Sequence, residues 1–457
     1  MRFTRGVTLI LVGLLLLTST FALSAALSPS RDVVREDPDV ASNATPEPVA
    51  DDDVLVAIQG GGPRWQENGR LYRVDGQTQE WQIGDRDSYF DVTRLANGSV
   101  VAGFHQNGYE SGCEPYDAPC TKTGFRVIDP GNGTPTVQSE YTFPVRSPTH
   151  REVHDVEAIG QNRFVFTDMD RERIGVVADG DLVWEWRAAD SGFYDVPPDP
   201  TTRDWLHIND VDHLGDGRFL VSVRNANQLL VVERGEGIVE VINEDRSAEN
   251  DETCTVSGQL ADFDDDGSVR CGDPSVLNHQ HNPQWLGNGT VLVADSENDR
   301  VVELTRGDDG RYRPQWALAE AGGIALDWPR DADRLSNGNT LITDSLNRRV
   351  FVVSPDGDVV WSYGTELIPY EADDATAGEP VAPSYANASV NESAFERPET
   401  GDGTGPRGDD VPGVSLLLVG IRAVFPRLPV WFAETQLLLT VVSFGLMTAG
   451  GVERARE

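Results

Sequence analysis

Alternating apolar and polar residues recur through the middle of the chain, and they predict short β-strands joined by tight turns. The clearest copies span residues 209–221, 281–293 and 330–342, and related stretches begin at Asp91 and His154. Each clear copy carries Asn-Gly or Asp-Gly at its centre, a pair that favours a two-residue hairpin turn with positive φ at both central residues. The alternation on either side is typical of half-buried strands.

Each copy continues into a further apolar strand, as at residues 300–304 and 349–353, and often into a last strand with tryptophan, such as Trp184 or Trp361. Four strands per unit, repeated at intervals of roughly 40 to 70 residues, are typical of propeller blades. We therefore predict an all-β fold, a six-bladed β-propeller; five or seven blades are the alternatives. The unit at residues 54–81 lacks a first strand, and we expect a strand from the C-terminal side to complete it and close the ring.

Apolar and acidic segments outside the repeats divide the rest of the chain. Residues 1–28 carry two arginines and then an apolar run, which indicates a signal peptide or an N-terminal membrane anchor. Residues 29–53 read as an acidic linker, 54–364 as the propeller, 365–410 as an acidic disordered linker, and 411–451 as an interfacial helix followed by a transmembrane helix. Arg454 and Arg456 favour a cytoplasmic C-terminus. We expect a cell-membrane protein with its propeller on the extracellular side.

The net charge of the chain limits the kinds of partner that it can bind. The chain has 75 acidic and 37 basic residues, for a net charge of -38, and Lys122 is its one lysine. An acid-rich, lysine-poor composition predicts a halophilic protein, while the apolar content argues against general disorder. A surface of this sign argues against binding of nucleic acid. The oligomeric state is left open.

Alignment of the repeats on the turn glycine brings histidines into register. One aligned position holds Phe90, His154, Asn209, His281 and Arg330, and the position two residues earlier holds Glu152, His207, His279 and Trp328. Residues two apart on a strand point to the same face, and the first strand of a blade lines the channel. We therefore expect these side chains to meet at the axis. Arg224 is predicted at the channel mouth, where its guanidinium could grip two oxygens of a sulfate or phosphate group; His150 and His213 are expected to be structural.

These motifs resemble the arylsulfotransferase family over about residues 54–364. The resemblance is carried by His207-Ile-Asn209, by Arg224-Asn, by His154-Asp and by Gln-His281-Asn282. It implies a six-bladed propeller that moves a sulfuryl group from an aryl sulfate to a phenol through a sulfohistidine, with no required cofactor. Carried over, His281 is the nucleophile, with His279 as the alternative, and His154, His207, Asn209 and Arg224 hold the sulfuryl oxygens and assist proton transfer.

Three features depart from the family pattern: Asn282 replaces a common aspartate, the membrane segments are additional, and an N-terminal β-domain found in bacterial periplasmic members has no room. Two other functions therefore stay open. One is a non-catalytic ligand-binding propeller on the cell surface, and the other is a hydrolase on the same fold.

Other side chains suggest binding or structural roles. The spacing of Asp262, Asp264, Asp266, Ser268 and Asp273 fits a calcium loop. Of three possible pairings of the cysteines, the simplest joins Cys113 to Cys120 and Cys254 to Cys271. Asp168, Asp295 and Asp344 recur six residues past their turns and are expected to lock each blade by hydrogen bonds. A metal on the histidines ranks low, because no carboxylate shares their register.

Overall fold

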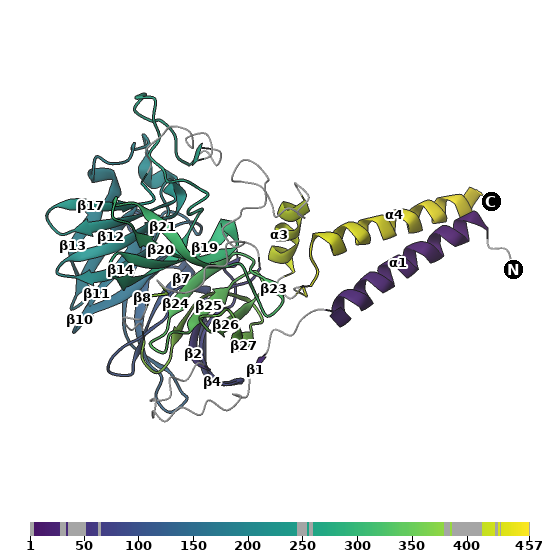
Figure 1. Ribbon diagram of the computed structural model, residues 1–457, viewed down its shortest axis with the longest axis horizontal. Helices are drawn as coiled ribbons and strands as arrows, with labels where there is room; N and C mark the ends of the chain where they lie inside the picture. The colour runs from purple at the N-terminus through teal and green to yellow at the C-terminus, as the bar shows by residue number, and fades with distance from the viewer. Residues whose placement is uncertain are drawn as a thin grey trace. The chain divides into compact units, whose positions relative to one another are not determined.

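A computed structural model describes residues 4–27, 33–34, 52–62, 65–244, 254–255, 259–378, 384–385, 414–425, 428–429 and 431–456. Six antiparallel sheets follow one another along residues 53–374 (Figure 1), and inner strands of each sheet contact inner strands of the next. The predicted six-bladed β-propeller is therefore confirmed.

Four main strands make up each blade. The first blade is β28 (Ile368–Asp374), β2 (Asp53–Gly60), β3 (Gly69–Asp75) and β4 (Thr78–Arg86). The second blade is β5 (Ser88–Tyr89) with β6 (Thr93–Arg94), then β7 (Val100–Tyr109), β8 (Cys120–Asp129) and β9 (Thr136–Val145). The third blade is β10 (Val156–Gly160), β11 (Arg163–Asp168), β12 (Arg173–Ala178) and β13 (Asp181–Arg187).

The second half of the ring repeats this order. The fourth blade is β14 (Ile208–Gly215), β15 (Arg218–Val223), β16 (Gln228–Glu233) and β17 (Gly237–Ile242). The fifth blade is β18 (His281–Gly287), β19 (Thr290–Asp295), β20 (Arg300–Arg306) and β21 (Tyr312–Leu318). The sixth blade is β24 (Pro329–Arg334), β25 (Thr340–Asp344), β26 (Arg349–Val353) and β27 (Val359–Gly364), with β1 (Val33–Val34) beside β27. A small hairpin, β22 (Glu320–Ala321) and β23 (Ile324–Ala325), precedes the sixth blade.

Ring closure follows the prediction, because β28 pairs with β2 in a register that joins Val54 to Asp374. The predicted boundaries need correction as a result. The propeller does not end at residue 364, since β28 lies inside the stretch assigned to the 365–410 linker. Similarly, β1 lies inside the 29–53 linker and pairs with β27. Residues 35–51, 379–383 and 386–410 lie outside the described residues, and so does the disorder predicted for them.

The hairpin turns are of two kinds. Asp216 and Gly217 both have positive φ, 52° and 79°, as do Asn288 and Gly289, at 52° and 75°. At Asn337-Gly338 only the glycine is left-handed, at 91°. There the Asn337 side chain accepts a hydrogen bond from the Asn339 amide, at 2.9 Å, and forms an Asx turn. The predicted turn type is therefore right for some pairs and wrong for others.

Carboxylates fasten neighbouring blades to one another. Asp155 follows the aligned position of the third blade and accepts a hydrogen bond from the Val211 amide of the fourth, at 2.7 Å. Glu371 does the same for the Val92 amide of the second blade, at 3.1 Å. These bonds from side chain to backbone hold neighbouring blades together at the inner strands.

A second set of acids locks single blades, as predicted. Asp295 is fully buried and accepts from the Asn278 amide, at 2.7 Å, and from Arg300 Nε, at 2.7 Å. Asp344 repeats the pattern with the Asp327 amide and Arg349. Asp168 likewise accepts from Arg173 Nε, at 2.7 Å. The buried carboxylate tolerates its burial because it is both paired and hydrogen-bonded.

The predicted disulfides are both present, between Cys113 and Cys120 and between Cys254 and Cys271. Each closes a short loop within or beside one blade, because the paired cysteines are 7 and 17 residues apart in sequence. Their presence agrees with an exported domain.

The terminal segments form helices: α1 (Arg5–Leu27), α3 (Val414–Val424) and α4 (Glu434–Arg456). Helices α1 and α4 are long and apolar enough to cross a membrane. They lie antiparallel (Figure 1), and a Cβ built on Gly6 would stand 2.7 Å from the Gly450 carbonyl oxygen. Gln436 Nε2 donates to Ser24 Oγ at 3.0 Å along the same contact. Glycine at this contact allows the two backbones to approach closely.

Candidate functional site

Six residues, one from each blade, converge around the axis on the first strands or immediately before them. All of them are buried: Phe90, His154, Asn209, His281, Arg330 and Tyr370. The ring centroid of His154 lies 4.6 Å from that of Phe90 and 5.0 Å from that of Tyr370, and His281 lies 5.9 Å from Tyr370. Five of the six were in the predicted register. Tyr370 was missed because it lies on β28, in the assumed linker.

The residues two positions earlier reach the site by a different route from the one predicted. His207, His279 and Trp328 precede their strands and adopt left-handed backbone conformations, with φ of 55°, 48° and 56°. Strand alternation therefore does not set their directions. A non-glycine residue held in this region costs about 1 to 3 kcal/mol, and such residues cluster at functional sites. The same strain at the same place in three blades marks this end of the propeller.

His281 is held in one tautomer. Its Nδ1 lies 2.8 Å from Ser296 Oγ and 3.1 Å from the His279 carbonyl oxygen. Ser296 donates its own hydroxyl proton to the Pro329 carbonyl, at 2.6 Å. A carbonyl can only accept, and the serine proton is already committed. Nδ1 of His281 must therefore carry the hydrogen, which leaves the lone pair on Nε2.

The pKa of His281 lies well below its usual value, chiefly because of burial and then because of the positive charges of Arg330 and Arg224. The imidazole is therefore neutral at neutral pH. The side chain of His279 has a different partner, with its Nδ1 3.7 Å from the Glu297 carboxylate.

His207 forms a dyad with Asp204, which lies three residues earlier and outside the repeats. The Asp204 carboxylate accepts from His207 Nδ1 at 2.8 Å. Burial lowers the pKa of His207 to about 4, against the opposing charge of Asp204. Burial alone would raise the pKa of Asp204, but contact with His207 lowers it to about 2. The pair is thus a neutral imidazole beside a carboxylate, and Nε2 of His207 is an acceptor.

Glu172 fixes the backbone that carries His207. Its carboxylate accepts the amides of Leu206, His207 and Ile208 at 3.0, 2.9 and 3.0 Å. Burial and the charge of Asp204 raise its pKa to about 8. The three bonds hold His207 in its strained conformation, so the dyad is preorganised.

His154 lies between the dyad and Tyr370. Its ring centroid is 5.4 Å from that of His207, and its Nδ1 is 2.8 Å from the Tyr370 hydroxyl. The pKa of His154 is well below its usual value, first because of burial and next because of His207 and Arg330. Burial also raises the pKa of Tyr370, so the tyrosine keeps its proton.

Two arginines face this site without an acidic partner among the described residues. Arg224 opens a short helix (Arg224–Ala226) and donates to Asn225 Oδ1 at 2.8 Å. Arg330 is buried, donates to Gln59 Oε1, and lies over Tyr370 with Cζ 4.9 Å from the ring centroid. Two guanidinium groups that form no salt bridge among the described residues, beside neutral histidines, favour a bound anion.

The predicted role of Asn209, to hold a sulfuryl oxygen or assist proton transfer, stays a prediction. Its Nδ2 donates to the Gln280 carbonyl at 2.9 Å, and its buried Oδ1 has no hydrogen-bond partner among the described residues. In this orientation Oδ1 could accept a hydrogen bond from a hydroxyl or a protonated imidazole, and Nδ2 keeps a second hydrogen that it could donate.

The predicted calcium residues are only partly brought together. Carboxylate oxygens of Asp262, Asp264 and Asp266 lie within 4.8 Å of one another, together with one from Asp195. Asp273 is not in this group, since it accepts from Ser275 elsewhere, at 2.8 Å. The backbone amide of Ser268 donates a hydrogen bond to the Asp266 carboxylate at 2.9 Å. Asp195, from a distant loop, stands where the sequence pattern placed Asp273, and calcium binding stays a prediction.

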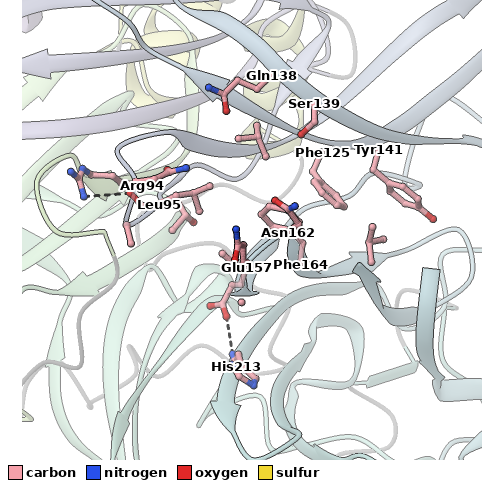
Figure 2. Close-up of a pocket in the computed structure, with 18 of the residues that line it drawn as sticks. Arg94, Leu95, Phe125, Gln138, Ser139, Tyr141, Glu157, Asn162, Phe164 and His213 are labelled. Atoms are coloured by element: carbon pink, nitrogen blue, oxygen red, sulfur yellow. Dashed lines mark hydrogen bonds between the residues drawn. The ribbon is translucent and has the colours of Figure 1, made fainter. Parts of the chain in front are cut away.

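A groove of about 1160 Å³ lies apart from the six axial residues (Figure 2). Phe125, Tyr141 and Phe164 line its apolar part, and none of the six axial residues borders it. His213 stands at its edge and donates its amide to Glu157 at 2.9 Å (Figure 2). His213 thus lines this groove, and its structural role stays a prediction.

No family model and no curated protein matches the chain. Solved propellers resemble it at low identity. A protein of unknown function from Bacteroides caccae is 11% identical, with 70% of this chain and 97% of that one covered and a TM-score of 0.43. The periplasmic gluconolactonase of Pseudomonas aeruginosa is 12% identical, with 72% and 98% covered and a TM-score of 0.38. The WD40 propeller domain of Doa1 is 12% identical, with 71% and 83% covered and a TM-score of 0.37. This degree of likeness carries no argument about activity.

Proposed function

We propose that the chain is an arylsulfotransferase that moves a sulfuryl group from an aryl sulfate to a phenol, with His281 as the nucleophile. The observation that carries the proposal is the pair of contacts that His281 Nδ1 makes with Ser296 and the His279 carbonyl. Ser296 and the His279 carbonyl both accept from Nδ1, so Nε2 offers a lone pair in a neutral, buried imidazole. A neutral nitrogen within the electrostatic influence of Arg330 and Arg224 suits attack on an anionic sulfate ester.

In the first half-reaction, Nε2 of His281 forms a bond to sulfur while the bond from sulfur to the phenolic oxygen breaks. The donor leaves as a phenolate. The negative charge spread over the sulfuryl oxygens is stabilised by Arg224, which has no acidic partner among the described residues. The positive charge of Arg330 adds to burial in lowering the pKa of His281, which keeps the nucleophile unprotonated.

In the second half-reaction, the acceptor phenol attacks the sulfur and the bond from sulfur to His281 breaks. Nε2 of His207 takes the phenolic proton, because Asp204 holds the other nitrogen as the donor. An imidazole with a pKa of about 4 gives that proton up readily, and it ends on the phenolate released in the first half-reaction. His154 and Tyr370 border the space in which the phenol would lie.

We place the protein in the cell membrane with the propeller outside. Three features support this: two disulfides, two helices able to cross a membrane, and arginines at the end of α4. The contact between α1 and α4 favours an α1 that is retained, since cleavage would remove the helix against which α4 packs. The substrates would then be extracellular phenols and their sulfates. The halophilic character stays a prediction from composition.

The proposal is tested on the full chain, purified in detergent and held at several salt concentrations. A chromogenic aryl sulfate is the donor and a second phenol the acceptor. We expect release of the coloured phenol that depends on the acceptor, and a complete loss of release in His281→Ala. Mass spectrometry without acceptor should find one added sulfuryl group on the peptide that contains His281. The control is His213→Ala, which removes a histidine distant from the axis and should keep activity.

The other candidate functions give different results. Release that ignores the acceptor would make the protein a hydrolase. If no salt concentration supports release while the aryl sulfate still binds, the protein is a binding propeller. Equal activity in His281→Ala and the wild type would refute the assignment of the nucleophile.

A further inference from the structure

Three side chains at the edge of the axial site gather like ligands of a metal ion. One donor atom each from His150, Asp204 and His207 lies within 4.8 Å of the other two. Asp204 Oδ2 is 3.4 Å from His150 Nδ1 and 2.8 Å from His207 Nδ1. The two histidines come from different loops, before β10 and before β14. From the repeats alone, a metal site on the histidines ranks low because no acid shares their register. Asp204 lies outside the repeats and supplies the missing acid.

The backbone around these donors is already fixed. Glu172 holds the amides of residues 206–208, and Asn225 Nδ2 donates to the Asp204 carbonyl at 3.1 Å. His150 and His207 both have left-handed φ, at 55° each. Two strained histidines on either side of one carboxylate are not needed for the propeller fold. Strain of this kind is found where side chains must be aimed.

The donor set selects the kind of ion. Two imidazoles and one carboxylate suit zinc and related transition metals, whereas calcium and magnesium prefer oxygen ligands alone. Three protein ligands also leave an open fourth position. The His150 side chain is 63% exposed, so an ion can reach the site from solvent.

We propose that His150, Asp204 and His207 bind a divalent transition-metal ion of the zinc class, and that the bound ion inhibits the enzyme. On binding, the ion takes the place of the hydrogen on His207 Nδ1, and that hydrogen moves to Nε2. The coordinated imidazole is then protonated at Nε2 and no longer takes a proton from the acceptor. The metal site stands without the proposed function, whereas the inhibition rests on it.

Binding is measured first, with no substrate present. The full chain, without a polyhistidine tag and freed of metal, is titrated with Zn²⁺ by calorimetry, and with Co²⁺ by visible absorption. We expect one ion per chain, and a tetrahedral cobalt spectrum that Zn²⁺ removes. Loss of a hydrogen-bond partner of a metal ligand weakens metal binding by about 10- to 100-fold. Loss of a ligand itself costs at least as much, so His150→Ala should weaken binding by about 100-fold. His213→Ala is the matched control and should bind normally.

Inhibition is measured next. Zn²⁺ should abolish sulfuryl transfer in the wild type, a chelator should restore it, and His150→Ala should keep its basal activity and resist zinc. Equal zinc affinity in His150→Ala and the wild type would overturn the site. So would binding that disappears only in Asp195→Asn, because the ion would then occupy the acidic loop. If transfer is absent while binding behaves as expected, the function proposal fails and the metal site stands.

Discussion

Replacement of Ser296 by alanine tests whether the tautomer of His281 matters for activity. Ser296→Ala removes the Oγ that lies 2.8 Å from Nδ1 and leaves the His279 carbonyl, at 3.1 Å, as the remaining acceptor. One hydrogen bond contributes about 1 kcal/mol net. Since about 1.4 kcal/mol corresponds to tenfold in rate, we expect the rate constant of the first half-reaction to fall about fivefold. Loss of the nucleophile itself should remove all transfer.

The chain supplies a matched control in the next blade. Ser345 occupies the equivalent position, is equally buried, and donates to the Pro369 carbonyl at 2.8 Å, as Ser296 does to Pro329. Its Oγ has no contact with a histidine among the described residues. Ser345→Ala therefore loses the same contact between blades and keeps His281 intact. Burst-phase release of the chromogenic phenol measures the first half-reaction in both variants. Equal burst rates in the two variants would refute the reasoning.

Three further predictions concern the dyad, the pH profile and the acidic loop. Asp204→Asn should lower kcat by about 100-fold or more, measured with saturating acceptor, because the amide permits the wrong tautomer of His207; an unchanged kcat would contradict the dyad. Burial lowers the pKa of His207 to about 4, so the neutral form persists below its usual 6.5 and activity should stay level from about pH 8 to pH 5; a fall with an apparent pKa near 6.5 would argue against it. Calcium at 100 times its Kd should stabilise the wild type by about 2.7 kcal/mol and Asp195→Asn by much less, measured by thermal unfolding; equal shifts would place the ion elsewhere.

The propeller could be predicted from the sequence because each blade repeats one local rule. Alternation marks the strands, and Asn-Gly or Asp-Gly marks the turns, so no long-range information is needed to find them. Even the missing strand of the first blade could be expected from the count. The position of that strand could not be predicted from the pattern. β28 pairs with β2, which lies far away in the sequence, and no turn signal lies beside β28. The boundary at residue 364 was wrong for that reason.

The site was predictable only where it obeys the repeat. His154, Asn209 and His281 share one register and meet at the axis. Tyr370 shares it too, but lies on the strand that the pattern does not mark. Asp204 has no counterpart in other blades, so no alignment could indicate it.

Backbone strain explains the remaining difference. The alternation rule assumed that His207 and His279 are strand residues, yet both lie before their strands with left-handed φ. His207 consequently turns to Asp204 and His279 to Glu297. Two histidines with the same place in the repeat thus receive different partners from loops whose sequences do not repeat.

The pairing of β28 with β2 sets the order in which the molecule can be assembled. Val54 and its partner Asp374 are separated by 320 residues, so the first blade must wait for the last one during synthesis. Until then β2 presents an unpaired edge, which is open to wrong partners and to other chains. Tyr370 arrives with the same strand. A chain that stops before residue 368 would therefore lack both a closed ring and one wall of the proposed site, and the ring can close only after β28 has been synthesised.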